Sequence, residues 1–477
     1  MKKILRPILC GGVLAALLCT PSLAAEQGDF SLLVNGEPVT FTDAAPVLKD
    51  GRSFLPVATT FQALGFAQED IVWNGETQSV TASKDGTTIS LTVGDSAVTW
   101  TGPSWSQTSE DGTSGSAGGS GGIAYLDAAP YIDPATNRTY IPVGLVADIL
   151  GCRVAWDGAT STVIIDDVDA ILAENTETYE RMDQYLDYAR KYSQGNYQVE
   201  GSYLLTSAPG EMESGAEIIH TVGGGYSMVT NQTAMQFAMD MSIGGTIMGA
   251  PIAPTDMNLD MRADLDTGML YLYFQSEDLE QLMNNNVQIN GETIEFQIPD
   301  QWYSLDMKAV YDEAYGPGFY EELIALSTAS QDAAFAQTLE ELLKSDTLTL
   351  TSTATTSDYL EALNQLLGDS HFQKSGSTYT STLEQDGVTI LFHLYTSGGQ
   401  VNGYGMEMTA SETTGMEMTM TMEMKGDDMS LLMEMAGMTM EMDGTYRPSS
   451  TAPETEPPAG ATVVDLWELL TTPVSEL

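Results

Sequence analysis

The stretch MEMTMTMEMKGDDMSLLMEMAGMTMEMDGTY, which runs from Met416 to Tyr446, carries methionine at alternate positions, then a turn, and then methionine at alternate positions again. Side chains two residues apart in a β-strand lie on the same face of a sheet, so the methionines of each segment share one face. Threonine and glutamate fill most of the positions between them and suit the face in contact with water. KGDD and Gly437 supply the turns. The stretch therefore predicts a β-meander with one methionine-rich face.

Three interpretations of this face are open. It is the buried core face of a sheet, a set of thioethers for a soft ion such as Cu(I), or the lining of a cavity for a lipid-like molecule or an apolar peptide. A copper site needs a few sulfur atoms at one point, whereas this stripe is long and contains no histidine or cysteine. The residues that we assign to ligand binding are Met406, Met408, Met416, Met418, Met420, Met422, Met424, Met433, Met435, Met438, Met440 and Met442.

The region around this stretch also reads as strands. Segments such as YQVEGSYLL from Tyr197 and YTSTLEQDGVTILFHLY from Tyr379 alternate apolar and polar residues. Helical stretches interrupt the strands near 309–344 and 357–367. The predicted fold class is α+β, with an antiparallel β-rich C-terminal domain, a curved half-barrel being one arrangement, and helices covering one face.

Composition limits the function. A chain of 477 residues predicts two or three domains. Its 17 Lys and Arg residues stand against 67 Asp and Glu residues, which gives a net charge of −50. Such a protein is repelled by nucleic acid and by anionic membrane surfaces, so neither is expected as a partner.

Residues 1–24 have the order of a secretory signal peptide. A positively charged start precedes the apolar ILCGGVLAALLC, and the small residues of SLA end at Ala24, where cleavage is expected. Cleavage leaves Cys152 as the single cysteine, so no internal disulfide is expected. No later stretch is apolar enough for a membrane helix. We expect a bacterial protein that is secreted or associated with the cell surface.

Two segments of the first third are alike. AAPVLKDGRSFLPVATTFQALGFAQEDIVWNGETQSVTA begins at Ala44, and AAPYIDPATNRTYIPVGLVADILGCRVAWDGATSTVIID begins at Ala128. Such self-similarity indicates one structural unit used twice. In the first copy, Asp50-Gly51 predicts a hairpin, and the residues after Pro56 have helical spacing up to Gly65.

Each copy is therefore predicted to be a short helix packed on an antiparallel sheet. The matching residues Trp73 and Trp156 are predicted to be its large core anchors.

This pattern resembles the copper amine oxidase N-terminal-like domain, also called the stalk domain. The resemblance covers about residues 30–167 and rests on VNGEPVTF at 34–41, GRSFLPV at 51–57, VWNGETQSV at 72–80, NRTYIPV at 137–143 and VAWDGATSTVII at 154–165. It implies an accessory, surface-displayed module without the copper or the chemistry of the oxidases. A Gly/Ser-rich insert at 108–122 departs from the pattern and predicts a flexible loop.

The expected organisation follows from these observations. It is a signal peptide (1–24), a stalk domain (25–167), a connecting helix (168–194), a methionine-rich antiparallel β domain with helices (195–446), and a Pro-rich spacer with a short apolar tail (447–477). The β domain only loosely resembles the curved-sheet lipoprotein carriers of bacterial envelopes. The tail is expected to dock on the β domain or to contact another molecule.

Signals for catalysis are weak. His220, His371 and His393 lie far apart in the sequence and are interpreted as ordinary sheet or surface residues. DMRADLDTG, which contains Asp264, is explained more simply by a hairpin turn than by a calcium site. No Ser-His-Asp order with supporting context, HExxH, phosphate-binding glycine loop or CxxC occurs. We therefore expect no enzyme, no cofactor and no resident metal.

These expectations combine into one function and two alternatives. The chain is predicted to be an exported, non-catalytic envelope or surface protein, with the stalk as attachment module and the β domain as binding domain. Its partners would be cell-wall or envelope components, or an apolar small molecule or peptide. The alternatives are Cu(I) handling by the methionines and an unrecognised envelope hydrolase.

Overall fold

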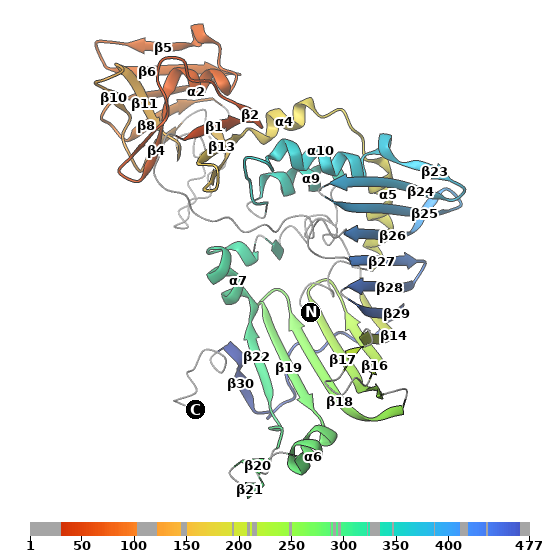
Figure 1. The fold of residues 1–477 in the computed structure, drawn as a ribbon. Coiled ribbons are helices and arrows are strands. Elements are labelled where there is room, and N and C mark those ends of the chain that lie inside the picture. The colour runs from red at the N-terminus through yellow and green to blue at the C-terminus, as the bar shows by residue number, and fades with distance from the viewer. Residues whose placement is uncertain are drawn as a thin grey trace. The chain divides into compact units, whose positions relative to one another are not determined.

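The computed structural model describes the chain from residue 30 to residue 467 with gaps (Figure 1). The described residues are 30–102, 122–144, 150–192, 195–207, 210–211, 217–247, 250–286, 288–289, 292–293, 297–321, 323–324, 334–345, 348–385, 387–410, 418–435 and 437–467. They form two compact units. The N-terminal unit contains the residues up to 176 together with 340–362, and the sheet unit contains 177–339 and 363–467. The fold class is α+β, which confirms the prediction.

The N-terminal unit is built from short strands in three sheets, ordered β12-β13-β1-β2, β10-β11-β4-β3 and β5-β6-β7-β8-β9. Its elements are β1 (Ser31–Val34), β2 (Glu37–Pro38), β3 (Val47–Lys49), β4 (Arg52–Pro56), α2 (Val57–Ala63), η1 (Gln68–Asp70), β5 (Ile71–Asn74), β6 (Ser79–Lys84), β7 (Thr87–Thr92), β8 (Ala97–Thr101), β9 (Gly122–Tyr125), β10 (Tyr131–Asp133), β11 (Arg138–Pro142), β12 (Arg153–Asp157), β13 (Thr162–Asp166) and α4 (Val168–Glu174).

The two similar segments meet at matching positions. Strand β4 pairs with β11 in antiparallel register, with Leu55 opposite Ile141, Pro56 opposite Tyr140 and Phe54 opposite Pro142. Because Leu55 and Ile141 occupy the same place in the two segments, this pair lies at the centre of a local two-fold relation. The first and last strands of the unit, β1 and β13, pair in parallel and close it.

Local turn chemistry agrees with the sequence in the first copy. Asp50 and Gly51 have φ values of 53° and 76°, the left-handed conformation that a two-residue hairpin loop requires. Helix α2 follows Pro56 directly and is succeeded by Gly65 at φ 84°. The corresponding helix of the second copy lies mostly outside the described residues.

The prediction that the two tryptophans anchor the core is wrong. Trp73 is 45% exposed on β5, and Trp156 is 50% exposed on β12. Both strands lie at the edge of their sheets, so a side chain there has a neighbouring strand on one side only. The centre of the core is instead aliphatic and phenylalanine-rich, and Leu55, Phe61 and Ile141 are fully buried in the unit.

A segment from the middle of the chain completes the N-terminal unit. The Arg153 guanidinium donates to the carbonyl oxygens of Leu343 at 3.1 Å and Leu348 at 2.7 Å. The Asp157 carboxylate accepts from the amide and the hydroxyl of Ser352, at 2.9 and 2.7 Å. Residues 340–362 therefore belong to this unit, which no local sequence pattern indicated.

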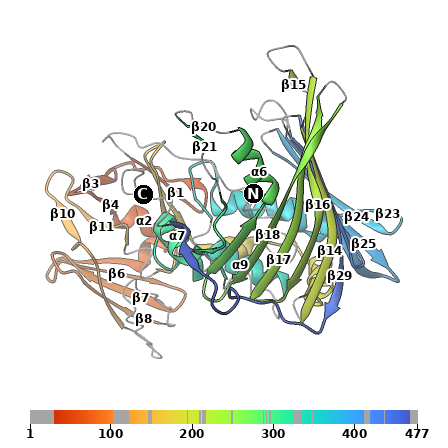
Figure 2. The same cartoon turned by 90° about the horizontal axis from the view of Figure 1, so that it is seen from below.

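The sheet unit is dominated by one sheet of order β23-β24-β25-β26-β27-β28-β29-β14-β16-β17-β18-β19-β22-β30, with β15 paired to β16. Every pairing along it is antiparallel except β22 with β30, and the sheet curls into a half-barrel (Figure 2). Its strands are β14 (Asn196–Ser207), β15 (Gly210–Glu211), β16 (Glu217–Thr230), β17 (Ala234–Ile247), β18 (Ala250–Asp264), β19 (Met269–Gln275), β22 (Trp302–Asp306), β23 (Gln373–Ser375), β24 (Thr378–Gln385), β25 (Val388–Ser397), β26 (Gln400–Ala410), β27 (Met418–Lys425), β28 (Asp428–Met435), β29 (Met438–Ser449) and β30 (Val463–Asp465).

Helices and a small hairpin accompany the sheet. They are α5 (Glu180–Arg190), α6 (Glu277–Asn286), β20 (Gln288–Ile289), β21 (Glu292–Thr293), α7 (Met307–Tyr315) and η2 (Asp369–His371). Helices α9 (Phe335–Lys344) and α10 (Thr356–Leu367) are each divided between the two units, because residues 340–362 belong to the N-terminal unit. Helix α5 packs on β26 and α6 packs on β18. Helix α6 was not predicted, although Ser276 marks its start by accepting from the amide of Leu279 at 3.1 Å.

The single connecting helix predicted for 168–194 is two helices. Helix α4 ends at Asn175, whose backbone is extended, and α5 begins at Glu180. The residues between them make other bonds: Glu177 accepts from the amide and the hydroxyl of Ser370. These contacts require extended backbone where the sequence pattern alone suggested a continuous helix.

The C-terminal tail crosses the sheet unit and docks on it. Arg262 donates to the carbonyl of Glu456 at 2.5 Å and forms an ion pair with Glu454 at 2.6 Å. The Trp302 amide donates to the carbonyl of Thr462 at 2.8 Å, and β30 then pairs with β22. Of the two possibilities that the sequence left open, the described part of the tail shows docking.

Candidate functional site

The methionine-rich face is built by strand register. In an antiparallel sheet, directly opposed residues point to the same face, so each set of partners forms a row across the strands. The Met408 row is Met408, Met420, Met433, Met440 and Leu205. The Ala410 row is Ala410, Met418, Met435, Met438 and Ser207.

Two further rows lie nearer the β27–β28 turn. The Met406 row is Met406, Met422, Leu431, Met442 and Tyr203. The Tyr404 row is Tyr404, Met424, Met429, Gly444, Gly201 and Tyr226. Successive rows are two residues apart, about 7 Å along the strands, so the four rows cover about 20 Å.

Burial of the methionine side chains falls from the Tyr404 row towards the Ala410 row. Met424 is 1% exposed and Met406 is 4% exposed, and Met422 and Met429 are also buried. The methionines of the Met408 row are all half-buried, and Met438 in the Ala410 row is 40% exposed. The methionine-rich face is therefore core at one end and accessible at the other.

Tyrosines cover the buried end. The Tyr185 ring of α5 lies edge-on to Tyr404 and Phe392, at 5.1 and 6.0 Å between ring centroids. The Tyr188 hydroxyl donates to the carbonyl of Gly426 at 2.7 Å, and burial raises the pKa of Tyr188 to about 12. Tyr188 is thus a neutral donor at ordinary pH, and it holds α5 on the β27–β28 turn.

Two glycines of the Tyr404 row, Gly201 and Gly444, leave space for the Tyr226 side chain. The Tyr226 hydroxyl donates to the carbonyl of Asp443 at 2.8 Å, so its ring lies across Gly201 and Gly444. A Cβ at either glycine would overlap the Tyr226 ring or hydroxyl.

Eleven of the twelve methionines assigned from the sequence lie on these rows. The twelfth, Met416, lies outside the described residues. The sequence pattern did not predict that Tyr203 and Leu205 of β14 belong to these rows. Strand β14 pairs with β29 across more than two hundred residues of sequence, so local periodicity carried no signal for it.

The arrangement has two chemical capacities. Methionine side chains are flexible and polarisable, so a half-buried set of them adapts to apolar molecules of varied shape. Thioethers on directly opposed residues are also cross-strand neighbours, and soft thioethers favour Cu(I).

His371 and His393 lie apart from this face, whereas His220 borders its accessible end, because the His220 amide donates to the Ser207 hydroxyl of the Ala410 row at 2.9 Å. On β25, the His393 Nδ1 lies 2.8 Å from the Thr380 hydroxyl, and its Nε2 lies 3.3 Å from a Glu407 oxygen. His371 lies 3.8 Å from Glu177, and His220 is exposed on β16. Within the described ranges no three His, Cys, Asp or Glu side chains gather in a way that could hold a metal ion.

The DMRADLDTG segment forms a turn. The Asp264 carboxylate accepts from the amides of Asp266 and Thr267, at 3.0 and 3.2 Å, between β18 and β19. These bonds account for Asp264 by the hairpin turn that the sequence favoured, whereas Asp260 lies within β18 and forms an ion pair with Arg262 at 3.6 Å.

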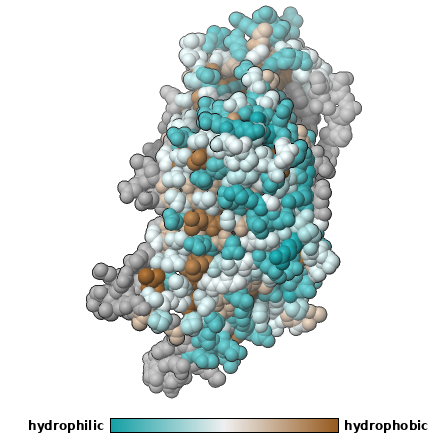
Figure 3. All heavy atoms as spheres, turned by 90° about the vertical axis from the view of Figure 1, so that its right-hand side faces the viewer, coloured by the Kyte–Doolittle hydropathy of each residue, from teal (hydrophilic) through white to brown (hydrophobic). Residues whose placement is uncertain are grey.

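The surface is mostly polar in the view of Figure 3, where small hydrophobic clusters are separated by hydrophilic residues. In the part of the chain that the structure describes, each helix is too short or too polar to cross a membrane.

Comparisons with known proteins add the following. A search of curated proteins found no match. A search of solved structures found a β-barrel-like protein of the domain of unknown function DUF1849 from Brucella abortus, at 10% identity over 53% of this chain and 98% of that chain, with a TM-score of 0.19. A TM-score this low carries no argument about the fold. Residues 33–165 match the family model described as copper amine oxidase N-terminal domain, so the first third of the chain is similar to that domain.

Proposed function

We propose that this chain is an exported, non-catalytic binding protein of a bacterial cell envelope. The sheet unit binds an apolar small molecule or an apolar peptide on the accessible rows of the methionine-rich face. The N-terminal unit serves as the display or attachment module, and its contacts would be cell-wall or envelope components.

One observation carries the binding proposal. The Met408 and Ala410 rows place seven methionines on four neighbouring strands, since they hold Met408, Met420, Met433, Met440, Met418, Met435 and Met438. All seven keep part of their surface accessible, up to 40% at Met438. A face whose only role was packing would gain most from complete burial, whereas a face that exchanges ligands needs adaptable, reachable side chains.

The attachment proposal has weaker but independent support. The match of residues 33–165 to the copper amine oxidase N-terminal domain supports an accessory role, because the stalk resemblance implies a module without the oxidase chemistry. Export is supported by the signal-like order of residues 1–24. N-terminal sequencing of the protein recovered from fractionated cells tests export; recovery of the uncleaved chain from the cytoplasm would refute it.

Binding is tested with an uncharged apolar fluorophore, N-phenyl-1-naphthylamine, whose emission rises in apolar surroundings. We expect saturable binding by the full chain and its loss in Met440→Glu, which puts a charge on the methionine-rich face. Thr439→Glu is the matched control, because Thr439 is adjacent in β29 but points to the opposite face. Equal binding by both variants would contradict the proposal.

Copper handling is the second candidate, and the direct opposition of methionines in the Met408 row favours it. Replacing Met420, Met433 and Met440 together by leucine separates the two functions, because leucine keeps the apolar surface and removes these thioethers of the Met408 row. Retained fluorophore binding with unchanged Cu(I) affinity supports the apolar-ligand proposal. Loss of tight Cu(I) binding with retained fluorophore binding assigns the thioethers to copper.

A further inference from the structure

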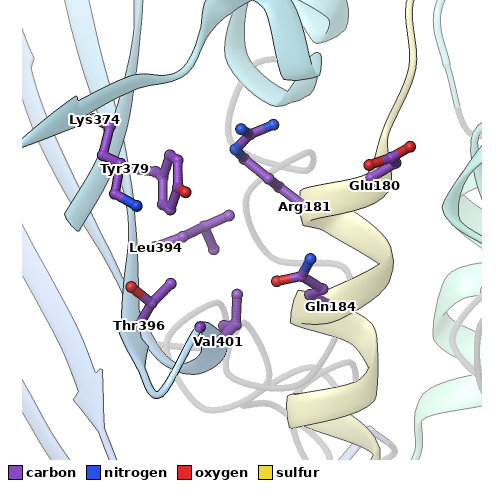
Figure 4. A pocket seen from close by; sticks show the side chains of 9 residues that line it. Glu180, Arg181, Gln184, Lys374, Tyr379, Leu394, Thr396 and Val401 are labelled. Carbon is purple, nitrogen blue, oxygen red and sulfur yellow. The ribbon is translucent and has the colours of Figure 1, made fainter. Parts of the chain in front are cut away.

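A pocket of about 120 Å³ lies in the sheet unit between the first turns of α5 and strands β23 to β26 (Figure 4), and no methionine lines it. It is called here the Arg181 pocket. Its lining combines cationic, hydroxyl, amide and apolar groups from Glu180, Arg181, Gln184, Lys374, Tyr379, Leu394, Thr396, Gly399 and Val401.

The Arg181 guanidinium is fixed in place by its surroundings. It stacks on the Tyr379 ring at 4.5 Å and on the Phe372 ring at 6.0 Å. Its Nη1 donates to Asp369 at 3.0 Å. Its Nε is buried and has no hydrogen-bond partner among the described residues.

Lys374 supplies a second cation. Its ammonium lies 4.9 Å from the centre of the Tyr379 ring, and it has no carboxylate within 4.0 Å in the described part of the chain. The hydrogen bond that the Lys374 ammonium donates to the Tyr379 hydroxyl, together with the nearby charges of Lys374 and Arg181, holds the pKa of Tyr379 below its ordinary value. The Tyr379 hydroxyl therefore lies in a locally positive field, although the whole chain carries a charge of −50.

Two carboxylates lie near these cations, and neither competes strongly for the pocket. Asp369 is engaged by the Thr178 hydroxyl, by the amides of Glu180 and Arg181, and by the Arg181 side chain. Glu180 is exposed, and its carboxylate points away from Lys374 and Tyr379 (Figure 4).

The other wall of the pocket is apolar. Leu394 is fully buried on β25, and Val401 is buried at the start of β26. A ligand that matches both walls carries one negative charge shared by two oxygen atoms, and it has a short hydrocarbon part. Volume restricts it further, because the pocket has room for on the order of ten water-sized groups.

We propose that the Arg181 pocket binds a small monocarboxylate, with its oxygens on the Arg181 guanidinium, Lys374 and the Tyr379 hydroxyl, and its hydrocarbon part against Leu394 and Val401. A carboxylate suits the planar guanidinium edge, and charge-assisted hydrogen bonds of this kind are the stronger ones. The proposal does not depend on ligand binding at the methionine-rich face.

The test is an NMR titration of the full chain labelled at the tyrosine ring carbons, with acetate or propionate replacing chloride at constant ionic strength. The Tyr379 signal is assigned by its loss in Tyr379→Phe. We expect a saturable shift of that signal and tighter binding of propionate than of acetate. Absence of saturation at either carboxylate would overturn the proposal, as would tighter binding of inorganic phosphate.

Matched lysine variants localise the site. Lys374→Met should weaken acetate binding about tenfold, because one charge-assisted bond is lost. Lys49→Met is the control, because Lys49 also stacks on a tyrosine, Tyr131 at 3.9 Å, but in the N-terminal unit. Equal effects of the two variants would refute the proposal. Arg181→Lys keeps the charge and removes the planar guanidinium, so undiminished affinity in that variant would refute it too.

Discussion

Asp369 shows how much one side chain can organise. Helix α5 has no cap from its own Tyr179, and the amides of Glu180 and Arg181 donate instead to Asp369, at 2.7 and 3.0 Å. Burial raises the pKa of Asp369, but the hydrogen bonds from these amides outweigh it and hold the pKa below its ordinary value. A residue nearly two hundred positions away in the sequence thus acts as the helix cap.

Asp369→Ala should therefore lower the free energy of unfolding of the sheet unit by roughly 1–2 kcal/mol at pH 7. The folded-state pKa is depressed, so this contribution is present above the unfolded value of about 3.9 and is lost as pH falls through the folded value. Urea unfolding at pH 7 and pH 3 measures it. Asp187→Ala, in the last turn of α5 and exposed, is the control and should cost less. A loss independent of pH would contradict the capping role.

Thioether chemistry provides a second prediction for single residues. Hydrogen peroxide transfers one oxygen to a methionine sulfur and is itself reduced to water, and the reaction follows access to the sulfur. We expect Met438 to be converted to the sulfoxide first and Met424 last, because they are 40% and 1% exposed. Peptide mass spectrometry at timed intervals measures this order. Simultaneous oxidation of both residues would show that the rows open as one.

At the scale of elements, period-two alternation found β14, β24, β25 and the methionine strands, but not the long strands β16 and β17. Pairing between distant strands was beyond it, because the partner of β14 on one side is β29. The prediction that the two tryptophans are core anchors was wrong for a related reason. Their size suggested burial, but their exposure depends on whether their strand lies at the edge of its sheet, and only the pairing of the strands reveals that.

The tail is the element whose role depends most on pairing. Strand β30 covers the edge of β22, and an uncovered edge offers unpaired backbone groups to another chain. Deletion of 450–477 should therefore cause concentration-dependent self-association, measured by size-exclusion chromatography with light scattering. Deletion of 468–477 alone keeps β30 and is the control. Equal behaviour of the two truncations would show that β30 does not protect the edge.

At the scale of the whole molecule, the sequence predicted two dissimilar parts but placed the boundary at a helix. The N-terminal unit also contains residues 340–362, which come from the middle of the chain. The bonds that hold this segment join Arg153 and Asp157 to backbone and hydroxyl groups of residues with no distinctive pattern. The same holds for the Arg181 pocket, whose lining comes from segments separated by about two hundred residues.

A substitution at Asp157 tests whether residues 340–362 are held in the N-terminal unit. Burial raises the pKa of Asp157, but hydrogen bonds from Ser352 and Thr160 bring it well below its ordinary value. Asp157→Ala should remove about 1–3 kcal/mol from the free energy of unfolding of the N-terminal unit. It should also raise amide hydrogen exchange in residues 348–357.

Asp133→Ala is the matched control for this effect. Asp133 starts the similar turn DPAT and accepts from Ala135 and Thr136, as Asp157 in DGAT accepts from Ala159 and Thr160, but no bond joins it to 340–362 in the described residues. Loss of one turn alone would affect both variants equally. Faster exchange in 348–357 for Asp157→Ala only would show that this carboxylate ties the inserted segment to the N-terminal unit. Because the Asp157 pKa is depressed, the difference between the variants should shrink as pH falls below about 4.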